Sequence, residues 1–317
     1  MARIADFLCT YDNASGFGAW AAEDYGIKFP DAYTEHEMMV KLALAVKEHN
    51  GAAVCLLPFC HTLEAEALGG IIRLGDGVTG PRTGGYICKT LEEVLELPEM
   101  QELYGAVPNG GMGLSAEESR KAECKIKSGG NILRFAETLE ACRILRQMGE
   151  MVVFLVSGPL TILNGIVDSE LVFRALLREP ELMGRVFEKL GRDILVVMKL
   201  AEDAGADFLS FADPAGGVNI VGPKVAARVA QTFTAKFLKE ADCRMRPETT
   251  VLLCPKTAFA LIGTEDAEWR DHVLPEPMEY MQAVLYKKKE LRFVGQDCMN
   301  HVGHRLADGR LKELVLK

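Results

Sequence analysis

The chain has 317 residues, of which 49% are hydrophobic and 26% are charged, and its formal net charge is -9. This acidic balance lacks a basic stripe and argues against nucleic acid or an anionic membrane surface as a partner. No apolar run approaches the ~20 residues that a membrane span needs, and the N-terminal stretch has no signal-peptide core. The nine cysteines follow no disulfide-framework spacing, which indicates reduced thiols in the cytoplasm.

Helical and strand-like segments alternate along the chain. Apolar residues recur at helical spacing over 35–49, and the buried apolar run 51–59 follows between Gly51 and Pro58 as a strand. Further helices are predicted over 131–150, 169–206 with a break at Pro180, 222–241 and 276–290. Further strands are predicted over 151–159, 207–217, 249–254 and 292–298.

Strands that are apolar on both faces and alternate with helices indicate a parallel sheet covered on both sides. Both an open doubly wound sheet and a (β/α)8 barrel satisfy this pattern. Five strands are evident, and a barrel would place three more within 71–90, 101–115 and 256–275. Polar or reactive residues follow the carboxyl ends of the five strands, as in a barrel, although an open sheet also binds ligands at that end.

The residues at these strand ends are the candidates for chemistry. They are Cys60-His61, Ser157-Gly158-Pro159, Asp213-Pro214, Cys254-Pro255 and Gln296-Asp297-Cys298. Each also has a structural reading, because Asp-Pro is a common turn and glycine allows close backbone approach. Glu64 and Glu66 open a helix, where a carboxylate is favoured by the helix dipole. Lys256 could meet an anionic acceptor group.

Six segments that follow one another along the chain carry a family resemblance. They are LPFCHTLEAEALGG (57–70), GPRTGGY (80–86), LVSGPLTILNGIV (155–167), AEDAGADFLSFADPAG (201–216), VLLCPKTAFAL (251–261) and FVGQDC (293–298). The chain resembles the uroporphyrinogen decarboxylase superfamily and, within it, the corrinoid-dependent methyltransferases. The resemblance implies one (β/α)8 TIM barrel domain over residues 1–317 with a short N-terminal extension, and a site at the C-terminal mouth.

The resemblance also implies a zinc site. In those methyltransferases a His-x-Cys strand end and a cysteine from a later strand bind zinc, which activates the acceptor thiol. The two cysteines match Cys254 and Cys298, but Leu252 stands at the histidine position. A catalytic zinc takes at least three protein ligands, so three accounts are open: a replacement ligand, loss of the metal with a different acceptor, or a repurposed site. The candidate replacements are His61, His301, His304, Glu64, Glu66 and Asp213.

The expected activity is transfer of a methyl group between a methylated corrinoid and a small-molecule acceptor. The resemblance implies that the corrinoid (methylcobalamin-like) rides on a separate partner protein, and that the acceptor is a zinc-activated thiol or, without metal, a pterin. The expected roles are catalysis by Asp213 and His61, substrate binding by Glu64, Gly158, Lys256 and Gln296, and metal binding by Cys254, Cys298 and His61.

A uroporphyrinogen decarboxylase is disfavoured, because it needs arginines near the N-terminus to pair with many carboxylates. This chain has only Arg3 before Arg73. A barrel that binds a tetrapyrrole or a corrinoid protein without turnover is the remaining reading.

Overall fold

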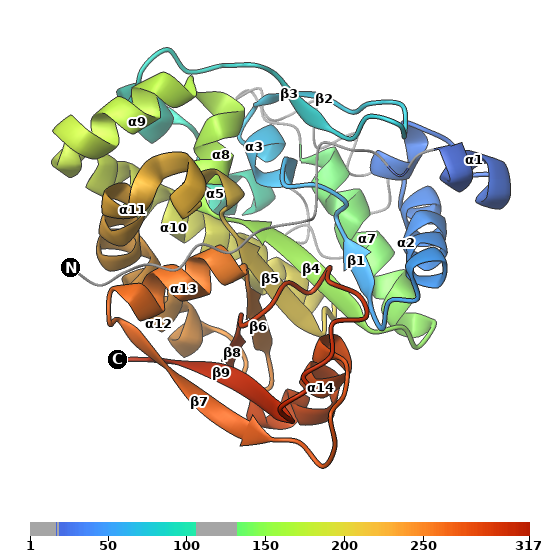
Figure 1. Ribbon diagram of the computed structural model, residues 1–317. Helices are drawn as coiled ribbons and strands as arrows, with labels where there is room; N and C mark the ends of the chain where they lie inside the picture. The colour runs from blue at the N-terminus through green and yellow to red at the C-terminus, as the bar shows by residue number, and fades with distance from the viewer. Residues whose placement is uncertain (1–16, 18, 106–131) are drawn as a thin grey trace.

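Figure 1 shows the computed structural model, an α/β fold in which residues 17, 19–105 and 132–317 are described. A seven-stranded mixed sheet lies at its centre, with the strand order β1-β4-β5-β6-β8-β9-β7. In that order the strands are β1 (Cys55–Leu57), β4 (Val152–Ser157), β5 (Phe208–Ala212), β6 (Thr250–Leu253), β8 (Phe293–Val294), β9 (Arg310–Leu316) and β7 (Ala267–Val273).

The five strands predicted from apolar runs are all present, and they pair in parallel as β1, β4, β5, β6 and β8. Two antiparallel strands extend this sheet, because β9 pairs with β8 and β7 pairs with β9. β7 lies in 256–275, where a strand was expected, whereas β9 was not predicted. β1 and β7 are the edge strands, and no pairing between them is seen in the described residues. The described strands therefore form an open mixed sheet, and closure into an eight-stranded barrel stays a prediction.

The other two ranges in which a barrel strand was expected, 71–90 and 101–115, contain no strand of the main sheet among the described residues. In 71–90 the strands β2 (Ile71–Arg73) and β3 (Arg82–Gly85) form a separate antiparallel hairpin. The range 101–115 begins in a helix that ends at Gly105. The rest of that range, like Cys124, lies outside the described residues.

Helices surround the sheet (Figure 1). They are α1 (Ala19–Tyr25), α2 (His36–Asn50), α3 (Leu63–Ala67), α4 (Leu91–Glu96), α5 (Met100–Gly105), α7 (Leu133–Gln147), α8 (Pro159–Ile166), α9 (Ser169–Arg178), α10 (Pro180–Asp203), α11 (Val218–Val229), α12 (Ala235–Arg244), α13 (Pro255–Gly263) and α14 (Tyr280–Lys287). The predicted break is confirmed, since α10 begins at Pro180, where a missing N–H costs nothing. Within the described part of the chain, no helix is both long and apolar enough to cross a bilayer.

The two faces of the sheet bury separate apolar clusters, which explains why the parallel strands have apolar residues on both faces. One face, with Phe154, Leu209 and Val251, packs into the large cluster formed with the surrounding helices. The alternate residues, among them Leu155 and Leu252, join a second cluster that includes Tyr280, Met281 and Val284 of α14. Side chains alternate between the faces of a strand, so every second residue faces this second cluster and the pocket above it.

Candidate active site

A pocket of about 100 Å³ opens at the carboxyl ends of the parallel strands. Its lining includes Leu155 of β4, Ser210 of β5, Leu252 of β6 and residues that follow β6 and β8. His61, Cys254 and Cys298 all line it, although they come from three distant parts of the chain. The pocket therefore gathers the three residues that were predicted as metal ligands; whether they bind a metal stays a prediction.

Cys254 stands where β6 turns into α13. Its backbone N–H donates to Phe211 O at 3.0 Å, and its carbonyl accepts from the N–H groups of Thr257 and Ala258 at 2.8 and 3.1 Å. Cys254 is thus the N-cap residue of α13, at the helix end that favours anionic groups.

Gly295 lets the second cysteine segment come close to the first. A Cβ on Gly295 would lie 2.9 Å from Cβ of Ala258 and 3.0 Å from Cβ of Leu253. Contacts that short are not tolerated between packed atoms, so only glycine allows the chain after β8 to lie against β6 and α13. This close packing leads Cys298 to the pocket that Cys254 lines.

His61 lines the pocket with a neutral imidazole ring that has one nitrogen available. Its Nδ1 atom is buried and has no hydrogen-bond partner in the described structure. Burial lowers its pKa from the ordinary 6.5 to about 4, so the imidazole is neutral at physiological pH. A neutral imidazole with an available nitrogen binds metals or accepts a proton. Leu252 lines the same pocket and is buried, so it supplies hydrocarbon where the resemblance expected a ring nitrogen.

The tightest group of potential metal ligands is a different set. Asp297, His301 and His304 each offer a ligand atom, and these atoms all lie within 4.8 Å of one another. Among the described residues, no other three His, Cys, Asp or Glu side chains have ligand atoms this close together. Both histidines were predicted as possible metal ligands, whereas Asp297 was named only as a residue at a strand end; the three are spaced as Asp-x3-His-x2-His in DCMNHVGH.

Asp213, predicted to be catalytic, is held by a helix end. Its Oδ1 accepts hydrogen bonds from the backbone N–H and the hydroxyl of Thr161, both at 2.7 Å, and its Oδ2 accepts one from the N–H of Leu160 at 3.2 Å. Burial raises the pKa of Asp213 to about 6, and these donors oppose the rise. The carboxyl group therefore satisfies the N–H groups that begin α8, as a capping residue does.

Glu64 has similar partners. Its Oε1 accepts from the N–H of Ser157 at 2.7 Å and its Oε2 accepts from the Ser157 hydroxyl at 2.6 Å. The side chain is 2% exposed, and burial raises its pKa. These bonds tie α3 to the end of β4.

The other predicted substrate-binding residues also have structural partners. Gly158 lies against Asp213, because an added Cβ would be 2.4 Å from Asp213 Cβ. Lys256 donates from Nζ to Asn219 Oδ1 at 2.7 Å, and the side-chain oxygen of Gln296 accepts from the backbone N–H of Lys312. None of these residues lines the pocket of the two cysteines, so their substrate contacts stay predictions.

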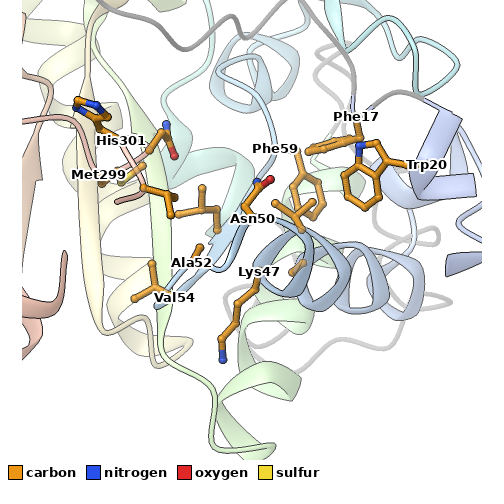
Figure 2. A pocket seen from close by; sticks show the side chains of 14 residues that line it. Phe17, Trp20, Lys47, Asn50, Ala52, Val54, Phe59, Met299 and His301 are labelled. Atoms are coloured by element: carbon orange, nitrogen blue, oxygen red, sulfur yellow. The ribbon is translucent and has the colours of Figure 1, made fainter. Parts of the chain in front are cut away.

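A larger pocket, of about 430 Å³, adjoins the first and shares Met299 and Asn300 with it. Figure 2 shows the aromatic side chains of Phe17, Trp20 and Phe59 on one side and Met299 and His301 on the other. The segment that carries Cys298 therefore borders two cavities.

Comparison with known proteins finds one family model, related sequences and a similar fold. Residues 116–267 match the family Uroporphyrinogen decarboxylase (URO-D). That match spans just under half of the chain, and over those residues the chain is similar to this family. The chain is also similar to the methylcobamide:CoM methyltransferase MtaA of Methanosarcina barkeri (strain Fusaro / DSM 804), with 24% identity over 244 residues, or 76% of this chain. A second Methanosarcina barkeri protein of that name is 23% identical over 77% of this chain.

The chain spans 62% and 63% of the lengths of those two relatives. A solved methyltransferase from Methanosarcina mazei has a similar fold, with a TM-score of 0.57 and 20% identity. That match covers 81% of this chain and 69% of the solved one. By sequence the chain is thus similar to proteins named methylcobamide:CoM methyltransferase, and its fold is similar to that of a methyltransferase.

Proposed function

We propose that the chain transfers a methyl group between a methylated corrinoid, carried by a partner protein, and a small-molecule acceptor. The observation that carries this proposal is the meeting of His61, Cys254 and Cys298 in one pocket at the strand carboxyl ends. The names of the two Methanosarcina barkeri relatives support the same reaction class. The transfer would break the bond between the methyl carbon and cobalt, leaving its electron pair on cobalt, while a lone pair of the acceptor forms the new bond to carbon.

The residue types of the pocket suit zinc, but among the described residues only Asp297, His301 and His304 have ligand atoms all within 4.8 Å of one another, so His61, Cys254 and Cys298 would have to move closer together to share a metal. Two thiols and one neutral imidazole are the ligand types that zinc prefers, and three protein ligands leave a fourth position for an acceptor. The His61 Nδ1 atom, buried without a hydrogen-bond partner among the described residues, is the nitrogen available to replace the one missing at Leu252. Zinc held there would keep an acceptor thiol in its nucleophilic thiolate form.

The chain's own contribution would be to hold the reacting groups and to exclude water. Cys254 and Cys298 would bind through sulfur, each fixed by the close packing of β6, β8 and α13. Leu155 and Leu252 form apolar walls beside them. A dry pocket strengthens charge interactions within it and protects a reactive nucleophile from competing reactions.

A metal-independent transfer to a nitrogen acceptor such as a pterin is the second candidate. It is favoured by Leu252, whose hydrocarbon side chain occupies the position of the expected nitrogen ligand. In this reaction the neutral ring of His61 would accept a proton from the acceptor, and charge that develops nearby during transfer would have to raise its pKa from about 4.

The test measures methyl transfer from free methylcobalamin to 2-mercaptoethanesulfonate and, separately, to tetrahydrofolate, together with zinc content. The variants are Cys254→Ala and Cys298→Ala. Cys243→Ala is the matched control, because Cys243 is exposed on α12. Loss of a ligand should lower thiol methylation by at least about 100-fold, more than loss of an outer-shell partner does, whereas the control should keep its rate.

The outcomes separate the candidates. Thiol methylation that disappears in both pocket variants supports the zinc-thiolate reaction. Transfer only to tetrahydrofolate, unchanged after chelation, supports the metal-independent reaction. Tight binding of methylcobalamin without transfer to either acceptor would overturn methyl transfer and favour a binding protein.

A further inference from the structure

The loop after β8 gathers two imidazole rings around one carboxylate. Nδ1 of His301 lies 3.2 Å and Nε2 of His304 lies 3.0 Å from Oδ2 of Asp297. The two rings are stacked with their centroids 4.9 Å apart. Asp297 is buried, whereas His301 and His304 reach the surface with 48% and 38% of their side chains exposed. The carboxylate of the group is therefore buried in the protein, whereas its two imidazole rings are accessible to solvent.

The Asp297 carboxylate is oriented so that one oxygen faces the two rings. Oδ1 accepts a hydrogen bond from the N–H of Cys298 at 2.7 Å and makes a longer one with Nδ1 of His301 at 3.4 Å. Oδ2 is buried and has no hydrogen-bond partner among the described residues, although both imidazole nitrogens are within ion-pair distance. The ring nitrogens thus approach this oxygen without the direction that an N–H···O bond requires. A buried carboxylate oxygen without a hydrogen bond is costly, and a cation shared by the three atoms would remove that cost.

The backbone brings the rings to one side. His301 N–H donates to Cys298 O at 3.0 Å, His304 N–H donates to His301 O at 3.2 Å, and Tyr280 N–H donates to His304 O at 2.8 Å. Gly303 has φ +81, the left-handed region that favours glycine, and it allows the chain to turn between the two histidines. These turns and the contact with α14 hold the loop without help from a ligand.

We propose that Asp297, His301 and His304 form a binding site for a divalent first-row transition metal such as zinc. Ligand atoms held about 2.1 Å from one zinc at tetrahedral angles lie about 3.4 Å apart. The distances of 3.0 and 3.2 Å to Oδ2, within a group spanning at most 4.8 Å, bracket that value. Two imidazoles select such a metal over calcium or magnesium, which prefer oxygen ligands.

This site adjoins the proposed thiol site, because Asp297 lines the pocket of the two cysteines and directly precedes Cys298. It differs in its ligands, since it uses no sulfur, and His301 is one of the residues that line the pocket of about 430 Å³ together with Trp20 and Phe59. Three protein ligands leave one position open, as in catalytic rather than structural zinc sites. A donor atom of a molecule in that pocket would take the fourth position.

The experiment is equilibrium dialysis of the metal-stripped full chain against zinc, with cobalt(II) as a spectroscopic probe. One variant is His301→Ala/His304→Ala and a second is Cys254→Ala/Cys298→Ala. His49→Ala is the control, because His49 is an exposed histidine stacked on Trp20. Cobalt bound by thiolates gives intense sulfur-to-metal charge-transfer absorption, which cobalt bound by imidazole and carboxylate lacks.

The proposal expects the thiol variant to retain one zinc per chain and to bind cobalt without the sulfur band. The histidine variant should lose that zinc, with its Kd raised at least about 100-fold, and the control should be unchanged. Zinc should also raise the Tm of the thiol variant but add nothing at this site in the histidine variant. Zinc binding that is the same in wild type and the histidine variant would overturn the proposal, as would no zinc retained by the thiol variant.

Discussion

Gly158 is the position where the geometry allows the sharpest stability prediction. It precedes α8 with φ -77 and ψ 167, a conformation open to any residue. The obstacle to a larger residue is steric, because a Cβ would lie 2.4 Å from Cβ, 2.5 Å from Cγ and 2.9 Å from Oδ2 of Asp213. Gly158→Ala must therefore displace a buried side chain that accepts three hydrogen bonds from the start of α8.

The expected cost follows from two contributions. Overpacking of a tight site costs about 1–3 kcal/mol, and a lost hydrogen bond to a charged group costs about 1.5–3 kcal/mol. Since the Asp213 carboxyl can shift and keep some of its partners, we expect Gly158→Ala to lower the free energy of unfolding by about 3 kcal/mol. Gly184→Ala is the matched control, because Gly184 lies inside α10 with nothing within 4 Å of an added Cβ. That substitution should stabilise the chain by about 0.5–1 kcal/mol.

The assay is urea unfolding followed by circular dichroism, with each substitution also made in an Asp213→Gly background. Removing the Asp213 side chain removes the clash, so Gly158→Ala should then cost less than about 1 kcal/mol. An equal cost in both backgrounds would refute the reasoning. So would a cost below about 0.5 kcal/mol in the wild-type background, which would leave Gly158 available for the substrate role that the sequence suggested.

Three further predictions concern the pocket and its supports. Leu252→His should raise zinc affinity at least about tenfold, measured by competition with a chelator, because the new ring would enter the pocket that Cys254 lines; unchanged affinity would contradict this placement. Arg134→Met should cost about 3–5 kcal/mol in urea unfolding, since it leaves the partly buried Glu66 carboxylate without its guanidinium, and adding Glu66→Gln should recover most of the loss. Burial holds the Asp213 pKa at about 6, above its ordinary 3.8, so its contribution to stability is complete below pH 4 and falls by about 3 kcal/mol as pH rises through 6. Asp213→Asn should lack that fall between pH 4 and 7, and parallel stability profiles would contradict the assignment.

The sequence predicted the parallel part of the sheet because burial on both faces leaves a local trace. The runs that became β4, β5 and β6 are apolar except for Ser157, Ser210 and Thr250, and Pro180 marked the boundary between α9 and α10. β9 escaped prediction because Arg310, Lys312 and Glu313 interrupt its apolar residues. It is a strand because β7 pairs with it along its full length, and such long-range pairing leaves no periodic signal.

The candidate site shows the same division. Local features, namely the ends of strands and the identity of their last residues, were enough to name His61, Cys254 and Cys298, and the structure places all three in one pocket. Local features did not show which of the strand-end carboxyl groups, Asp213 or Asp297, has structural hydrogen-bond partners and which is available to a ligand. Asp213 accepts hydrogen bonds from residues 52 and 53 positions earlier in the chain, whereas Asp297 keeps one oxygen without a hydrogen bond among the described residues.

The sequence by itself determined which segments are buried and which reactive side chains stand at the ends of buried strands, because hydrophobic periodicity and turn residues are local properties. Only the tertiary structure decided which polar groups have partners. That depends on the packing of segments that are far apart in the chain, and it separates a carboxylate that caps a helix from one that faces two imidazoles.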